Sequence, residues 1–592
     1  MKLQIPAFIK LRKNLNSLLM GNSEVLDCNN VIFEDGKVKK RAGYAQLGSN
    51  LPLNGRVSLI TEFSKLRVNE KQTICCTEHE VYKFYNGAWI FLTPVYNTGT
   101  AAASGTAVTG AGGATWDTGW PASQYYIKFG TNDKNGIGSP DVWFTIASVD
   151  SATGITLAST AGTIGAGAYV IRKSFALTVT DDWQVAYVIM PPGGTDELWG
   201  IFVNGTEIWY YDGTTFADLA GTTLGAKFIK SYYDHIVIGF VTDGSDSLPQ
   251  SIYWNERGDP TDWTGGSSGY VDLLQGTGEI TGLEVLHQRM YVTKNDSIVE
   301  GYYTGDATVP FIFNEDKIYK AGCVNGKTLV NNSKELLFQS ADNILSFDGF
   351  QVNPIGDEVA TDLIQNVNSE YAYKNFAVNI PDKHLYCLFI VTIGYTEPNK
   401  VYVFNYLSRV WTIWSMADFM RCVGEYSVTA TATWESVANG IKWSDMSGYW
   451  NIRSISAGSN NFAFGDSAGY VYRMDFTGTL DDDANIDCFI ETKDYEAYDS
   501  EGQPKADTAM KLLRTLLTME SYLGDIRVRY STDFGVSWST PIDFTQSVPV
   551  RHYFQRWLGR GNQIRFRIEN IDNSRFDIIN MMIEYNESGR IN

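Results

Sequence analysis

Residues 336–350 read LLFQSADNILSFDGF, and this stretch carries the pattern on which the fold prediction depends. Two short runs of apolar and aromatic residues are separated by a polar turn, and the second run ends in Asp348-Gly349. An Asp-Gly pair between extended segments favours a type I′ turn, since both central positions tolerate a positive φ. The stretch therefore predicts a β-hairpin with an aromatic residue soon after its turn.

The same kind of unit recurs along the chain. Aromatic-rich strands also run into Asn86-Gly87 and Asp212-Gly213, and similar runs occupy 401–414 and 462–475. Between them lie strands of nearly continuous apolar character, such as 235–241 (HIVIGFV), which suits burial on both faces. The inner and outer strands of a propeller blade differ in this way, so the repetition predicts a β-propeller.

Residues from about 98 to 175 interrupt this pattern. They begin with a stretch rich in Gly, Ala, Ser and Thr and continue with strand-like runs at 125–129, 142–149, 155–157 and 166–171. A disordered linker is the alternative for the first part. However, Trp116, Trp120, Trp143 and Phe144 supply enough apolar surface to hold a small β-barrel together. We therefore expect an inserted β-barrel domain at 98–175.

The remaining chain divides into three parts. An N-terminal segment, 1–45, joins a platform to the propeller, which occupies 46–97 and 176–476. At about 40 to 50 residues per blade, this length holds about seven blades, with six or eight as alternatives. Pairing of the first strand with the last would close the ring and remove exposed edges.

The C-terminal part, 477–592, has a different pattern. Residues 526–530 (IRVRY) and 564–568 (IRFRI) alternate apolar residues with arginine, so one face of each strand is buried and the other is solvated. An antiparallel β-sandwich is the expected solution. The predicted fold class is therefore all-β, with a propeller, an inserted small β-barrel and a C-terminal β-sandwich platform.

Composition disfavours several classes of protein. The 592 residues contain 47 Lys and Arg against 67 Asp and Glu, and this net charge of −20 is unsuited to gripping nucleic acid. Simple solubility is the favoured explanation of this charge, and an acidic channel wall that lets a DNA duplex slide without sticking is the alternative. The seven scattered cysteines are expected to be reduced and mostly buried thiols. No segment has the length and apolarity of an export signal or a membrane span.

Residues 531–538 (STDFGVSW) match the Asp-box pattern through Ser531, Asp533, Gly535 and Trp538. In such a hairpin the carboxylate accepts hydrogen bonds from turn amides, the glycine has a positive φ and the tryptophan packs beneath. Asp boxes occur in sialidase-like propellers, which makes a glycosidase the enzyme class to consider. This box is single and lies outside the propeller, and no carboxylate pair is marked as acid and nucleophile. We expect a structural hairpin and no enzyme activity.

No cofactor or metal site is predicted. Asp481, Asp483, Asn485 and Asp487 alternate as in a calcium loop, but Ile486 stands where a glycine is required and Thr492 where an acidic ligand is required. We interpret the segment as a solvated acidic turn. The five histidines do not pair at ligand spacing and no Cys-x-x-Cys occurs, so a zinc site has little support.

Five arginines near the C-terminus are interleaved with aromatic residues, and they form the main basic patch: Arg551, Arg556, Arg560, Arg565 and Arg567. Salt bridges across a subunit or domain interface are the favoured interpretation, because most of the chain is acidic. Binding of a phosphate backbone or a sugar is the alternative.

Both ends of the chain resemble one family. The N-terminus carries EVLDCNNV at 24–31, Asp-Gly at 35–36 and Lys40-Arg41-Ala42-Gly43-Tyr44, in an order that resembles the opening of the tail tube (nozzle) and packaged-DNA stabilisation proteins of short-tailed bacteriophages. The Asp box, followed by RWLGR at 556–560 and IRFR at 564–567, is similar to the closing sandwich of the same group. The insert, with IASVDSATGITL at 146–157, resembles small barrels found in such proteins.

This resemblance implies a structural virion protein, assembled in the host cytoplasm. It would form a homohexameric nozzle at the distal end of a short tail, extend the DNA conduit and retain the genome. The implied partners are the head-to-tail adaptor protein, tail fibres or spikes, and double-stranded DNA that passes through the lumen without specific binding. The alternative is a carbohydrate-binding or glycosidase-like tail protein whose aromatic-rich loops act on host glycans.

Overall fold

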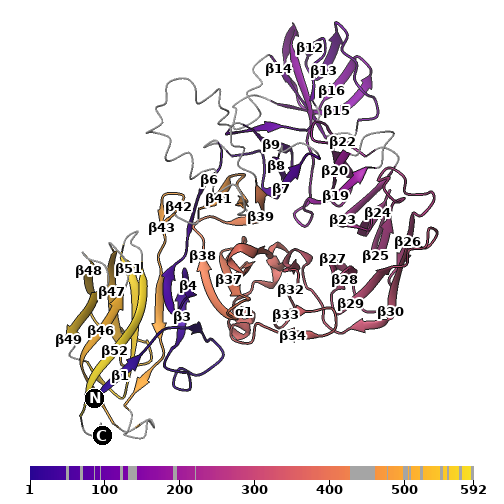
Figure 1. The fold of residues 1–592 in the computed structure, drawn as a ribbon. Helices are drawn as coiled ribbons and strands as arrows, with labels where there is room; N and C mark the ends of the chain where they lie inside the picture. The colour runs from indigo at the N-terminus through magenta and orange to yellow at the C-terminus, as the bar shows by residue number, and fades with distance from the viewer. Residues whose placement is uncertain are drawn as a thin grey trace, which may run out of the picture. The chain divides into compact units, whose positions relative to one another are not determined.

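The fold is almost entirely β, as predicted (Figure 1). Among the described residues the helices are α1 (Ala360–Asn366), η1 (Gly326–Thr328), η2 (Ser369–Lys374) and η3 (Pro381–Lys383). The computed structural model describes residues 1–592 except 49–51, 67–70, 86, 94, 121–123, 131–142, 191–196, 220–221, 427–460, 476–477, 498–504, 506–507, 520–523, 547–550, 557–558, 572–575 and 589–592.

The chain divides into two compact units. Unit 1 contains Met1–Ala45, Lys327–Phe419 and Met474–Asn592, and unit 2 contains Gln46–Gly326 and Met420–Arg473. The propeller bounds of 46–97 and 176–476 stay a prediction. The grouping of 327–419 with the two ends of the chain was not anticipated.

Unit 2 contains four antiparallel sheets, each built from four strands that are consecutive in the chain. The first is β7 (Val57–Ser64), β8 (Lys71–Thr77), β9 (Val81–Tyr85) and β10 (Ala88–Phe91). The second is β19 (Gln184–Met190), β20 (Glu197–Val203), β21 (Ile208–Tyr211) and β22 (Phe216–Asp218). The third is β23 (Leu224–Tyr232), β24 (His235–Asp243), β25 (Asp246–Trp254) and β26 (Gly269–Asp272). The fourth is β27 (Ile280–Leu286), β28 (Arg289–Lys294), β29 (Ile298–Tyr303) and β30 (Phe311–Tyr319).

A further sheet of unit 2 has the order β39 (Met420–Tyr426), β40 (Asn461–Asp466) and β41 (Val471–Asp475). In unit 1, β6 (Gly43–Gln46) pairs with β42 (Leu480–Asp481), which pairs with β43 (Ala484–Asn485). The Leu47 amide donates to the Val471 carbonyl at 2.7 Å, and the Leu53 amide donates to Gly469 at 2.8 Å. An early segment of the chain is thereby joined to a late one within unit 2.

Buried apolar side chains link the sheets of unit 2 in series. One core combines Ile60 of the first sheet with Ala463 of β40, and another combines Phe63 with Trp209 of the second sheet. The second sheet shares a core with the third, and the third shares one with the fourth. Each sheet therefore packs against the next, which explains why its central strands are apolar on both faces.

The predicted insert is an eight-stranded antiparallel sheet in unit 2. Its order is β11 (Val95–Tyr96), β18 (Tyr169–Lys173), β14 (Tyr125–Phe129), β15 (Phe144–Ser151), β16 (Gly154–Leu157), β13 (Ala107–Ala111), β12 (Thr100–Ser104) and β17 (Thr163–Gly167). Trp116 and Trp120 belong to its core, and Trp120 stacks on Tyr125. The Gly- and Ala-rich stretch is therefore part of the sheet, and the linker alternative is wrong.

Unit 1 contains two more four-stranded sheets. One is β31 (Val330–Asn331), β32 (Leu336–Gln339), β33 (Ile344–Phe347) and β34 (Val352–Pro354). The other is β35 (Phe376–Ile380), β36 (Leu385–Ile390), β37 (Lys400–Asn405) and β38 (Val410–Ser415). Leu337 and Tyr386 share one core, so these two sheets also pack together.

The two ends of the chain interleave in the remaining sheets of unit 1. One has the order β4 (Val31–Glu34), β5 (Lys37–Lys40), β52 (Asp577–Glu587), β46 (Met510–Met519) and β49 (Arg551–Arg556), with β1 (Lys2–Ile5) on β52 and β50 (Arg560–Gly561) on β46. The other has the order β2 (Lys10–Leu11), β3 (Glu24–Asn29), β44 (Phe489–Thr492), β51 (Gln563–Ile571), β47 (Gly524–Ser531) and β48 (Ile542–Gln546), with β45 (Tyr495–Glu496) on β51. In Figure 1 the indigo β1 lies beside the yellow β52.

The prediction of type I′ turns is wrong for two of the three hairpins. Gly213 and Gly349 both have φ of +94°, but Asp212 and Asp348 are not among the residues with positive φ. Each aspartate instead begins a four-residue loop and accepts hydrogen bonds from two amides at 2.7 or 2.8 Å. The side chain therefore stabilises the loop in place of a tight backbone turn. Asn86, in the third hairpin, lies outside the described residues.

Candidate functional site

The Asp box forms a hydrogen-bonded hairpin at the end of β47. Asp533 accepts a hydrogen bond from the Ser537 amide at 2.9 Å and also bonds the Ser531 and Ser537 hydroxyls. These bonds lower the pKa of Asp533 from 3.8 to about 2. Gly535 has φ of +86°, and Trp538 is half-buried. The carboxylate is thus used to hold the loop.

The five arginines of the C-terminal patch have different environments. Arg565 is buried and its Nη2 lies 2.6 Å from an oxygen of Asp494, which is fully buried. Arg567 bonds Glu491 and Glu569, and Arg560 is exposed. Arg551 and Arg556 lie on β49, but their side chains are outside the described part of the chain.

The Asp box and the arginine patch meet at one place. A Cβ added to Gly535 would lie 2.7 Å from Nη1 of Arg565, so the loop packs directly on this guanidinium. Arg565 in turn bonds Asp494, which also accepts a hydrogen bond from the hydroxyl of Ser17. The arrangement ties the C-terminal hairpin to the N-terminal segment. It is structural, and the role of the patch at an interface with another subunit remains a prediction.

The Lys40–Tyr44 motif surrounds a buried arginine. Arg41 uses all five of its N–H groups: Nε donates to Asn30 at 2.8 Å, and the two terminal nitrogens donate to Asp481, Ala42 and Ser415. The side chains of Arg41 and Asp481 are 1% and 3% exposed. A buried charge pair is stable only when its polar atoms are satisfied in this way.

Gly43 and Tyr44 of the same motif have equally specific roles. A Cβ added to Gly43 would lie 1.8 Å from the carbonyl oxygen of Leu480, so only glycine lets these backbones approach. The Tyr44 hydroxyl donates to a carboxylate oxygen of Asp418 at 3.0 Å. The motif that carries the family resemblance, Lys40–Tyr44, therefore holds separate segments of unit 1 together. We call this set of contacts the joint around Arg41.

The interpretation of 481–487 as a solvated acidic turn is wrong for its first residue. Asp481 is buried as the partner of Arg41, whereas Asp483, Asn485 and Asp487 are exposed. Nothing near Asp481 in the sequence marks it as different, because its partner lies 440 positions earlier. Among the described residues no group of three or more His, Cys, Asp or Glu side chains is arranged to hold a metal ion.

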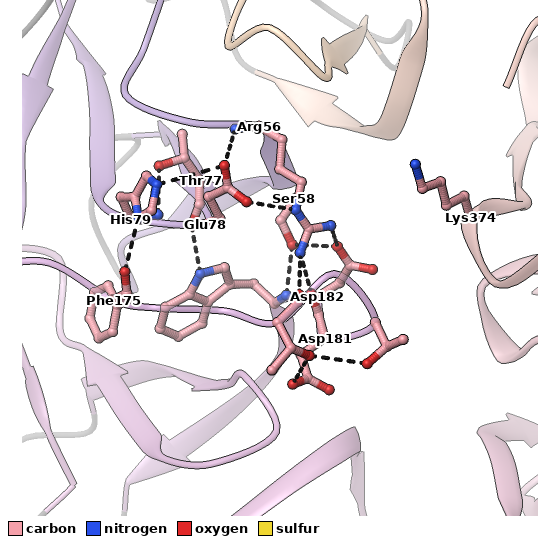
Figure 2. Close-up of polar contacts among 12 residues, drawn as sticks. Arg56, Ser58, Thr77, Glu78, His79, Phe175, Asp181, Asp182 and Lys374 are labelled. Atoms are coloured by element: carbon pink, nitrogen blue, oxygen red, sulfur yellow. Dashed lines mark hydrogen bonds and ion pairs between the residues drawn. The ribbon is translucent and has the colours of Figure 1, made fainter. Parts of the chain in front are cut away.

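Another buried arginine, Arg56, fastens the end of the insert to the first sheet (Figure 2). Arg56 donates to Glu78 at 3.0 Å and to Asp182 at 3.1 Å, and its Nη2 donates to the carbonyls of Thr178 and Asp181. Nearby, the Nδ1 of His79 lies 3.0 Å from the carbonyl oxygen of Phe175. These bonds hold the turn between β8 and β9 against the chain that leaves the insert.

Beside this turn lies a cavity of about 450 Å³ between the insert and the first sheet. Its lining includes Asn54, His79, Tyr126, Trp143, Arg172 and Ser174. The volume is within the range of about 300–1,000 Å³ that is usual for small-molecule sites. Arg172 has no local signal in the sequence, since Glu80, its ionic partner, lies far away in the chain.

Arg172 is the central charged group of the cavity. Its Nη2 lies 2.9 Å from Oε1 of Glu80, and its guanidinium carbon lies 3.8 Å from the ring centroid of Trp143 and 4.6 Å from that of Phe91. Burial raises the pKa of Glu80, against the opposing effect of Arg172, and Glu80 also accepts a hydrogen bond from Tyr82. Nη1 of Arg172 is buried and has no hydrogen-bond partner in the described part of the chain.

Comparison with known proteins does not assign this chain to a family. No family model matches it, and no curated protein matches it. Among solved structures it is similar to Hsv2 of Kluyvelomyces marxianus, with 7% identity, coverage of 54% of this chain and 76% of that chain, and a TM-score of 0.25. It is also similar to an exo-β-1,3-galactanase of Phanerochaete chrysosporium, with 8% identity, coverage of 67% and 95%, and a TM-score of 0.21. Structural similarities this weak do not support any conclusion about the fold or the function of this chain.

The described residues also contain no helix that is long and apolar enough to cross a membrane.

Proposed function

We propose that this chain is a structural subunit of a short bacteriophage tail, where six copies form the nozzle at its distal end. The observation that carries the proposal is the joint around Arg41. The residues that resemble the nozzle family, Arg41, Gly43 and Tyr44, are the ones that tie the N-terminal segment to other parts of unit 1. A motif whose residues hold parts of the fold together indicates a structural role, which is the role of a nozzle subunit.

The propeller belongs to this proposal. Five sheets pack in series in unit 2 and two more pack together in unit 1, and in a propeller these seven would be consecutive blades. The eight-stranded sheet would be the inserted barrel. The terminal sheets, built from 1–40 and 489–587, would be the sandwich that serves as the platform.

The proposed role is mechanical. The subunits would extend the DNA conduit beyond the adaptor protein, retain the genome until ejection and anchor fibres or spikes, and the protein would be located in the virion. A net charge of −20 supports a lumen that DNA traverses without binding. The proposal assigns no catalytic residue and no cofactor.

Native mass spectrometry of the purified chain with its adaptor, and of tails released from virions, tests this function. We expect a species of about 396 kDa, which is six copies of the 66.0 kDa chain. A chain that stays monomeric inside assembled virions, or that is absent from them, would overturn the proposal.

A further inference from the structure

We propose that the cavity beside Arg172 binds a neutral hexopyranose unit of a glycan. The inference stands apart from the nozzle proposal, because it rests on the cavity alone. A structural tail protein and a protein of any other class could both carry such a site.

The first argument is the hydrogen-bonding state of Arg172. The side chain is 7% exposed, and its Nη1 has no partner among the described residues although it is buried. Leaving a buried donor without an acceptor is costly, so such groups in native proteins call for an explanation. A sugar hydroxyl in the cavity would supply the acceptor. Its own proton would then be free to bond a neighbouring oxygen.

The second argument is that the guanidinium is held in place before any ligand arrives. Glu80 forms an ion pair with it at one edge, while the rings of Trp143 and Phe91 lie close to its carbon. Arginine loses less conformational freedom per hydrogen bond when its planar group is already positioned. The cavity is therefore organised around one fixed donor.

The third argument is the charge of the lining. Glu80 offsets the charge of Arg172, and the other lining residues include no Asp, Glu, Lys or Arg. A ligand with a carboxylate or a phosphate would find no uncompensated lysine or arginine in this lining. A neutral polyhydroxylated ligand fits the site better, because it needs donors and acceptors without net charge.

The fourth argument is the mixture of side chains. Tyr126 and Trp143 are half-buried aromatic residues of the lining, which also includes the polar residues Asn54, His79 and Ser174. The C–H face of a pyranose packs well on an aromatic ring, while its hydroxyls need polar partners around the edge. The cavity combines both kinds of surface.

Saturation-transfer NMR on the full chain tests the inference. The probes are the methyl glycosides of glucose, galactose, mannose and N-acetylglucosamine at about 10 mM, with glucuronic and galacturonic acid as charged counterparts. We expect saturation transfer to at least one neutral glycoside and weaker transfer to the acids. The inference is overturned if no neutral glycoside binds, or if the acids alone bind.

Variants locate the binding. Trp143→Ala and Tyr126→Ala should each weaken binding of the responding glycoside by about tenfold or more. Ser174→Ala, a smaller change, covers the case in which an aromatic variant does not fold. Tyr270→Ala is the matched control, since Tyr270 is an exposed aromatic residue of unit 2 that does not line the cavity. Unchanged binding in the folded cavity variants would overturn the assignment to this site.

Discussion

Arg41 and Asp481 lie 440 residues apart in the sequence and form a buried ion pair in which Nη1 of Arg41 donates to Oδ1 of Asp481 at 2.8 Å. The remaining N–H groups of Arg41 bond Asn30, Ala42, Ser415 and the second oxygen of Asp481. One side chain therefore connects all three segments of unit 1. Loss of this side chain should therefore destabilise the whole of unit 1.

Replacing Arg41 with alanine should destabilise unit 1 strongly. The variant leaves the carboxylate of Asp481 buried without its cation, and breaking a buried pair in this way costs about 3–5 kcal/mol. Arg41→Lys should also destabilise, because lysine cannot reproduce five N–H groups in one plane. Denaturant unfolding measures both variants.

Arg257→Ala is the control for this prediction, since Arg257 pairs with Asp234 on the surface and both side chains are more than half exposed. Surface pairs contribute little, so this variant should unfold as the unmodified protein does. Equal stability of the Arg41 and Arg257 variants would contradict the role of the joint.

Gly43→Ala should destabilise the protein through a steric clash. The added Cβ would lie 1.8 Å from the carbonyl oxygen of Leu480, so a backbone segment must move. Overpacking of this kind costs about 1–3 kcal/mol or more. Gly165→Ala is a matched control, because its Cβ meets nothing within 4 Å and its φ is unexceptional. Thermal unfolding of the two variants should separate them clearly.

Asp533 should stay ionised in acid, where most carboxyl groups take up a proton. Its hydrogen bonds lower the pKa from 3.8 to about 2. The bonds therefore stabilise the hairpin above the ordinary pKa of aspartate, and this stabilisation is lost as the pH falls toward about 2. The carboxyl carbon signal of Asp533, assigned with Asp533→Asn, should barely move between about pH 5 and pH 3. Ser537→Ala removes one donor and should raise the pKa partway.

None of the seven cysteines should react with a thiol reagent in the native protein. All are free and buried, and burial raises the pKa of Cys28 and Cys488 to about 12. Ellman's reagent at about pH 8 should detect fewer than one thiol per chain before unfolding and seven afterwards. Val536→Cys is the positive control, since Val536 is 85% exposed and a thiol there should react at once.

Local patterns predicted the strands well. The run at 125–129 coincides with β14, and those at 526–530 and 564–568 lie within β47 and β51. The cysteines were expected to be mostly buried, and all seven are. The turn type was wrong at Asp212 and Asp348, because the side chain of aspartate competes with the backbone for the loop amides.

The long-range contacts could not be predicted in the same way. Asp481 looks like its exposed neighbours in the sequence, and Arg172 looks like one more basic residue in a strand. Their partners, Arg41 and Glu80, are distant in the chain, and no local spacing relates them. Strand register and the order of strands in a sheet depend on packing between whole elements.

The sequence by itself determined an all-β protein with short aromatic strands and Asp- and Gly-containing loops, because alternation and turn chemistry act within about ten residues. Only the tertiary structure decided that the first strands of the chain pair with the last, that Asp481 is buried against Arg41, and that a cavity forms around Arg172. These features depend on which strands and loops from distant parts of the chain come into contact when it folds. Burial of a charged group is favourable only where a partner from another part of the chain satisfies it.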